Sequence, residues 1–172
     1  VGFSPDLTWI KGRSASGLNH MWFDSVRGVT KRLYSDGTGA ESTDTETLTA
    51  FGSDGFTLGN SGNVNGSTVT YASWNWLAGT AFSNSADTNG ATIATTGQVN
   101  QDAGFSVFTY TGNGTVGATL KHGLTTVPHV IIVRRRNTAN SWYVYHHANT
   151  SAPETDYLEL NNTNATNDGD FI

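Results

Sequence analysis

The chain has 172 residues, of which 13% are charged, 36% hydrophobic and 11% aromatic. Its formal net charge of −5 argues against nucleic-acid binding, because contacts with phosphates need clustered Lys and Arg. The absence of cysteine excludes disulfides, thiolate metal sites and thiol nucleophiles. No apolar run approaches the roughly 18 residues of a membrane-spanning helix, so no membrane insertion is expected. The length and aromatic content predict one folded domain.

The composition favours strands over helices. Gly, Thr, Asn and Ser are abundant, and Asp-Gly or Asn-Gly pairs, which supply the positive φ of tight turns, recur at short intervals, as at 36–37, 65–66 and 113–114. We therefore predict an all-β fold, an antiparallel β-sandwich of the jelly-roll or concanavalin-A-like kind with almost no helix. The predicted strands are 7–11, 20–24, 31–34, 48–51, 56–58, 69–76, 105–110, 129–136, 141–146 and 156–160.

Three local expectations accompany this assignment. In the strand 69–76, alternation places Trp74 and Trp76 on one face, which we expect to be the core side. Residues 77–103 are the least patterned stretch and are predicted to be a long connection or a pair of weak edge strands. The only candidate for a helical turn is 25–28.

An internal repeat divides the chain into two offset halves, 1–76 and 104–172, joined by 77–103. Each half has a strand without a counterpart in the other, 69–76 in the first and 105–110 in the second. This predicts a window on a longer repetitive chain, or one sandwich of two unequal halves, with strand edges that a neighbouring subunit or domain covers. The aligned segments are 2–14 with 123–137, 20–24 with 142–146, 31–34 with 156–159, and 53–57 with 167–171.

Six motifs carry a resemblance to a known family. They are GFSPDLxWIKxRS at 2–14, FDSVRG at 23–28, FxSDGFTLG at 51–59, GFSxxxYTGNG at 104–114, HGL at 122–124 and WxVYH at 142–146. As a set, they resemble the repeated domains of tail-fibre and other virion appendage proteins of marine bacteriophages. The resemblance implies a laminin-G-like or concanavalin-A-like sandwich in a virion, outside the cell. It also implies other virion subunits as partners, homo-oligomers and host surface polysaccharide as a ligand.

The acidic segment 154–159 offers an alternative, enzymatic function. Glu154, Asp156 and Glu159 have the spacing Glu-x-Asp-x-x-Glu, which resembles the active-site strand of family 16 glycoside hydrolases. Retaining hydrolysis needs two carboxylates about 5 Å apart. Strict alternation places Glu159 on the opposite face from Glu154 and Asp156, so a β-bulge would be required. The expectation is therefore that the protein is not an enzyme.

Metal sites are limited by residue type and spacing. His146 and His147 are adjacent, so on a strand they point to opposite faces and do not share one ion. No metal-binding histidine motif is present, and no cofactor is expected except calcium, which oxygen-rich loops leave open. The histidines are His20, His122, His129, His146 and His147. The calcium candidates are Asp36, Asp54, Asp168 and Asp170.

Aromatic side chains are the remaining binding candidates, because an exposed indole or phenol stacks on the apolar face of a sugar ring. The strand 141–146 presents either Trp142, Val144 and His146 or the two tyrosines outward. A free carbohydrate-binding module of a secreted enzyme is therefore a further alternative. The triplet 134–136 is interpreted as a solvated strand end or a subunit contact. The predicted sugar-binding residues are Trp22, Trp142, Tyr143, Tyr145 and His146.

Overall fold

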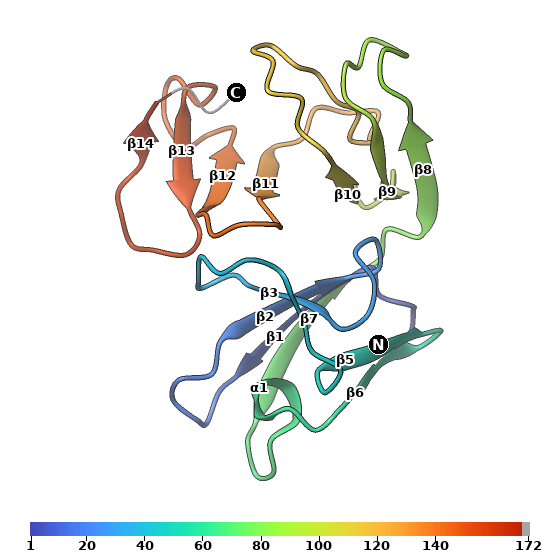
Figure 1. Cartoon of the computed structure of the whole chain (residues 1–172), viewed down its shortest axis with the longest axis vertical. Coiled ribbons are helices and arrows are strands. Elements are labelled where there is room, and N and C mark those ends of the chain that lie inside the picture. Colours follow the sequence, from blue (N-terminus) through green and yellow to red (C-terminus); the bar gives the residue numbers. More distant parts are fainter. Residues whose placement is uncertain (170–172) are drawn as a thin grey trace.

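A computed structural model describes residues 1–169 and confirms the predicted all-β fold with antiparallel sheets and almost no helix. Figure 1 shows a five-stranded sheet and a two-stranded hairpin in the lower half, and two further sheets above them. Every predicted strand has a counterpart in the structure. In chain order, the elements are β1 (Leu7–Gly12), β2 (His20–Asp24), β3 (Lys31–Tyr34), β4 (Ser42–Thr43), β5 (Leu48–Gly52), β6 (Gly55–Leu58), α1 (Gly62–Asn65), β7 (Tyr71–Trp76), β8 (Thr80–Asn84), β9 (Thr95–Asn100), β10 (Phe105–Tyr110), β11 (Val130–Arg134), β12 (Trp142–His146), β13 (Asp156–Glu159) and β14 (Asn167–Asp168).

The first sheet has the strand order β4-β3-β2-β1-β7. Alternation in β1 and β2 places Ile10, Met21 and Phe23 on one face, and all three are buried. The β5–β6 hairpin and α1 cover that face with Leu48 and Val64, which complete the core cluster. The opposite face of the sheet carries tryptophans and is turned toward the two upper sheets.

The sheet β11-β12-β13-β14 repeats the meander β1-β2-β3-β4 in strand order and in register. Every pair that connects the strands of one meander has an equivalent in the other. This equivalence matches β14 with β4, whereas the sequence alignment matched 167–171 with the β5–β6 turn. The equivalent pairs are Leu7↔Asp24 with Val130↔His146, Met21↔Tyr34 with Tyr143↔Glu159, and Lys31↔Thr43 with Asp156↔Asp168.

Residues 77–103 form two strands of the third sheet, β10-β9-β8. β8 is an edge strand, but β9 is the central strand, and it buries Thr95, Gly97 and Val99. Gly97 is required there, since a Cβ atom would lie 2.3 Å from the Val107 carbonyl oxygen. The one candidate for a helical turn in the sequence, too short to count as a predicted helix, is not helical in the structure. Residues 25–28 form a hydrogen-bonded turn, while the described helix is α1.

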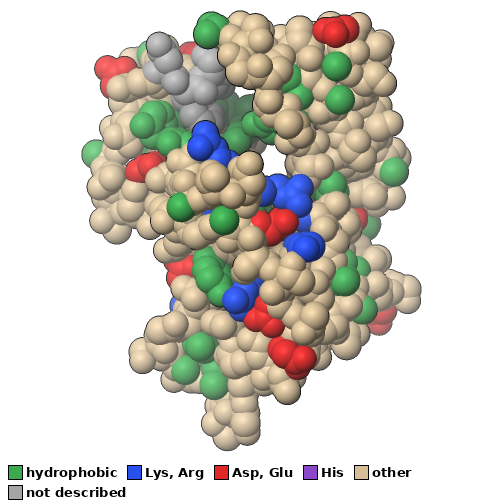
Figure 2. All heavy atoms as spheres, in the orientation of Figure 1, with side chains coloured by type: hydrophobic (Ala, Val, Ile, Leu, Met, Phe, Trp, Pro, Cys, Tyr) green, Lys and Arg blue, Asp and Glu red, His purple; other side chains and the backbone are tan. Residues whose placement is uncertain are grey.

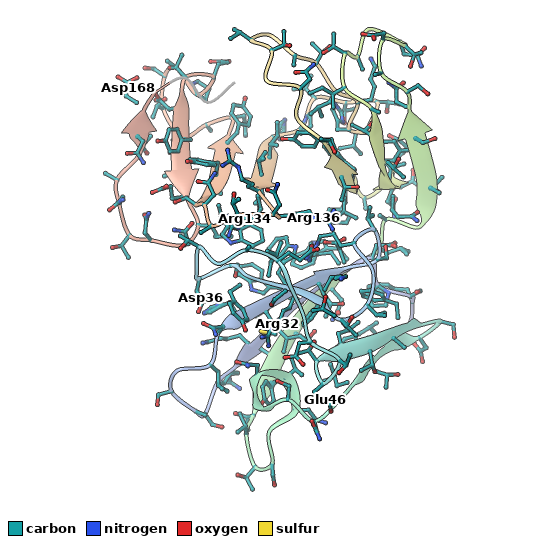
Figure 3. All side chains as sticks on the ribbon, in the orientation of Figure 1. Arg32, Asp36, Glu46, Arg134, Arg136 and Asp168 are labelled. Carbon is teal, nitrogen blue, oxygen red and sulfur yellow. The ribbon has the colours of Figure 1, made fainter. Side chains whose placement is uncertain are left out.

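The loop between β3 and β4 joins the two meanders. Trp142 Nε1 donates to the Tyr34 carbonyl oxygen at 2.7 Å, and Arg134 Nη2 donates to that of Thr38 at 2.6 Å. Arg136 donates two hydrogen bonds to the Glu41 carboxylate, each 2.9 Å long. Figure 3 shows Arg134, at the end of β11, and Arg136, just after it, near the first sheet, and Figure 2 shows Lys and Arg side chains gathered in this region. The arginine triplet therefore contributes an intramolecular contact.

Candidate functional site

A row of four tryptophans crosses the upper face of the first sheet. Trp74 of β7, Trp9 of β1 and Trp22 of β2 are register partners, so their side chains share one face. Ring centroids are 5.7 Å apart for Trp74 and Trp9, and 5.3 Å apart for Trp9 and Trp22. Trp142 of β12 continues the row at 5.2 Å from Trp22. The row therefore runs from the edge of the sheet into the junction between the meanders.

Exposure decreases along this row. Trp74 is 49% exposed, Trp9 and Trp22 are half-buried, and Trp142 is only 2% exposed. Trp9 Nε1 is buried and has no acceptor among the described residues. Trp74 was expected to face the core, but the other side of β7 does so, through Tyr71. The one indole of the row that offers a broad face to solvent is thus Trp74.

Polar side chains lie beside Trp9 in the next row of the sheet. Lys11 and His20 are register partners, and the His20 ring lies 6.2 Å from that of Trp9. Lys11 Nζ donates to the Leu18 carbonyl oxygen. We name Trp74, Trp9, His20 and Lys11 the Trp74 platform. It combines a flat apolar surface with a hydrogen-bonding rim, which is the chemistry that a sugar ring needs.

A family model described as "Domain of unknown function (DUF7483)" matches residues 1–172. The chain belongs to the DUF7483 family. No curated protein matches this DUF7483 domain, and no solved structure matches it. In the part of the domain that the structure describes, no helix is long and apolar enough to span a membrane.

In this DUF7483 domain, none of the predicted sugar-binding residues belongs to the Trp74 platform, although Trp22 lies directly beside its Trp9. Trp142 is buried and donates its indole N–H to backbone carbonyls, so it cannot stack on a sugar. Trp22 is held between two other indoles. Tyr143 and Tyr145 are half-buried on the opposite face of β12 from Trp142, and Tyr143 contacts Tyr157 edge to face at 5.2 Å.

The structure does not assemble the three acidic residues into a hydrolase site. Glu154 lies exposed in the turn before β13, and Asp156 is buried and accepts hydrogen bonds from Thr150 Oγ1 and Thr155 Oγ1. Hydrogen bonds from Ser141 and then Asn162 lower the pKa of Glu159. A general acid needs a raised pKa, so this shift does not favour Glu159 as the general acid of such a hydrolase.

The calcium candidates occupy separate places. Asp54 Oδ1 accepts a hydrogen bond from the Gly2 amide at 2.5 Å, and Asp36 Oδ1 accepts one from the His20 amide at 3.0 Å. Asp168 is exposed on β14, and Asp170 lies outside the described residues. Within residues 1–169, no group of three His, Cys, Asp or Glu side chains is arranged to hold a metal ion. The described calcium candidates are therefore not gathered into one carboxylate cluster.

Three histidines cluster at one end of β12. The rings of His129 and His147 stack with centroids 4.1 Å apart, and those of His146 and His147 are 5.2 Å apart. The expected opposition of His146 and His147 is not observed, because β12 ends at His146 and His147 lies in the following turn. The pKa of His147 is lowered. Loss of hydration contributes most, and electrostatic repulsion from the neighbouring His129 and His146 adds to it. The cluster is exposed and none of its members belongs to the Trp74 platform.

Proposed function

We propose that this DUF7483 domain is a non-catalytic module of a bacteriophage tail fibre or similar virion appendage that binds host surface polysaccharide through the Trp74 platform. The observation that carries the proposal is the exposure of Trp74 at the end of a tryptophan row whose other members are wholly or partly buried. An indole supported by a second indole on a sheet is held rigidly, so little conformational entropy is lost when a ligand stacks on it.

The form of the surface supports a polymeric ligand. The platform reaches the edge of the sheet at Trp74 and is open on that side, since β7 pairs only with β1 among the described strands. An open surface accommodates a chain that continues in both directions, whereas a small-molecule substrate is normally enclosed. His20 and Lys11 provide hydrogen-bond donors for hydroxyl or acidic groups of the polysaccharide.

The virion assignment is supported by the motif set of both repeat halves, which resembles phage appendage domains. Low charge, tight turns and antiparallel strands are consistent with a rigid domain outside the cell, where the lack of cysteine makes folding independent of redox conditions. Location on the virion and contacts with other virion subunits are parts of this proposal.

A glycan array of bacterial surface polysaccharides, followed by calorimetric titration with the strongest ligand, tests the proposal. We expect saturable binding that falls at least tenfold in Trp74→Ala. Tyr110→Ala is the matched control, because Tyr110 is a similarly exposed aromatic residue on another sheet. Binding that Trp74→Ala leaves unchanged, or the absence of saturable binding to any polysaccharide, would contradict the proposal.

A further inference from the structure

The strand β11 is an edge strand with an apolar surface. It pairs with β12 and has no second neighbour among the described strands. Val130 is 48% exposed and Ile132 is 40% exposed, and alternation places both on one face. We name the free backbone of β11 together with these two side chains the β11 edge. A free edge beside exposed branched side chains is the kind of surface that proteins normally protect.

The first meander shows what covers the equivalent edge. β1, the counterpart of β11, pairs with β2 on one side and with β7 on the other. By the shared register, Val130 corresponds to Leu7, and Ile132 corresponds to Trp9. Trp76 of β7 is the register partner of Leu7, which is 4% exposed. The exposure of Val130 therefore coincides with the absence of any described strand in the position of β7.

The backbone of β11 is also oriented to accept such a strand. The His147 amide donates to the His129 carbonyl oxygen at 2.9 Å, and in an antiparallel ladder every second residue faces the same neighbour. Ile131 and Val133 therefore bond toward β12, while the N–H and C=O groups of Val130 and Ile132 point away from it. The same alternation directs Leu7 and Trp9 toward β7, because the Arg13 amide donates to the Thr70 carbonyl oxygen at 2.7 Å.

From this equivalence, we propose that the β11 edge binds an extended segment of another protein as an antiparallel strand. The segment carries large apolar side chains at alternate positions, opposite Val130 and Ile132, as β7 carries Trp76 and Trp74 opposite Leu7 and Trp9. Main-chain hydrogen bonds supply the affinity, and the alternate side chains supply the specificity. The β7 strand of the same chain cannot fill this position, since it is already paired with β1.

The probe is a fluorescently labelled peptide with the sequence of residues 69–77, which contains β7. Anisotropy measured with the full chain should show saturable binding that weakens at least tenfold in Ile132→Lys. Val116→Lys is the matched control, because Val116 is fully exposed and lies outside every strand. A peptide carrying Ala72→Pro loses an amide of the ladder, because Ala72 is the register partner of Lys11, and should not bind.

Two further measurements separate the outcomes. Amide exchange should show that the peptide protects Val130 and Ile132 in the full chain. Sedimentation of the unmodified chain alone should show a monomer. A dimer that Ile132→Lys dissociates would make a second copy the occupant and overturn the proposal, as would peptide binding that is independent of Ile132 or no binding at all.

Discussion

The two meanders of this domain have the same strand order and register but very different surroundings. The first is covered on its edge by β7 and on one face by the β5–β6 hairpin and α1. The second has no described strand in the position of β7 and no described hairpin in the position of β5–β6. The difference shows that strand pairing alone defines the meander, while burial depends on the segments added to it.

The side chains at equivalent positions follow this difference. Met21 and Phe23 are fully buried in the first meander, whereas their counterparts Tyr143 and Tyr145 are half-buried. Tyrosine suits a partly hydrated face, because its ring packs while its hydroxyl remains in contact with water or a polar group. The sequence of the second meander is thus adapted to a face that is less completely covered.

The largest expected effect compares Phe23 with Tyr145, which are equivalent residues. Phe23→Ala should lower the free energy of unfolding by about 4 kcal/mol, because it leaves a cavity in the closed core. Tyr145→Ala should cost less than half as much, because its ring is already partly exposed. Denaturant titration measures both values, and equal losses would mean that the two faces are equally well packed.

A smaller effect is expected at the junction of the meanders. Trp142→Phe removes the indole N–H that bonds to Tyr34 and Gly37, and should cost about 2 kcal/mol. The loss should also reduce the cooperativity with which the two meanders unfold. Trp74→Phe, at the exposed end of the same row, is the control and should change stability by less than about 0.5 kcal/mol. Similar values for the two variants would contradict the assigned difference in burial.

The ion pairs of the junction predict that the free energy of unfolding depends on pH. Burial acts to raise the pKa of Glu41, but hydrogen bonds from Arg136 and Arg27 outweigh it, so the pKa lies below the ordinary value of 4.5. The stabilisation is therefore complete above about pH 4.5 and is lost as the pH falls through the pKa of the folded state.

Glu41→Gln should accordingly cost about 1–2 kcal/mol at neutral pH and progressively less below pH 4.5. Glu46→Gln is the matched control, because Glu46 is exposed and forms no ion pair with a described residue. Urea titration between pH 3 and pH 7, at values spaced by about one unit, measures the effect. A loss for Glu41→Gln that does not change with pH would exclude this carboxylate as the source.

The smallest expected effect is at the β11 edge. Val130→Thr keeps the shape of an exposed side chain and should change the free energy of unfolding by less than about 0.5 kcal/mol. A loss near that expected for Leu7→Ala, about 3 kcal/mol, would show that Val130 is as well covered as its counterpart Leu7.

The strands could be predicted from the sequence because runs of β-branched and aromatic residues are separated by Gly-containing turns. The central strand of the third sheet, β9, could not be predicted in this way, because it consists of Thr, Gly, Gln, Val and Asn rather than an apolar run. Its burial comes from its two neighbours, which a local pattern does not describe. The two-residue strands β4 and β14 are too short to leave any pattern.

The candidate site was harder to predict, because alternation shows which residues share a face but not which face is inside. Trp74 was expected in the core and Trp142 was a sugar-binding candidate, whereas the structure exposes Trp74 and buries Trp142. The deciding contacts join residues about 100 positions apart, such as Trp142 with Tyr34 and Gly37. One sequence feature could have indicated the site. Trp9, Trp22 and Trp74 each lie in a strand, and antiparallel pairing brings them into one row.

Amide hydrogen exchange of β1 and β11 tests the central claim, that one meander is closed at its edge and the other is open. The account predicts slow exchange for Trp9 and Lys11, whose amides face β7, and fast exchange for the equivalent Ile132 and Arg134. Within β11, Val133 should remain protected because it faces β12. Equal protection of the equivalent amides in β1 and β11 would contradict the account.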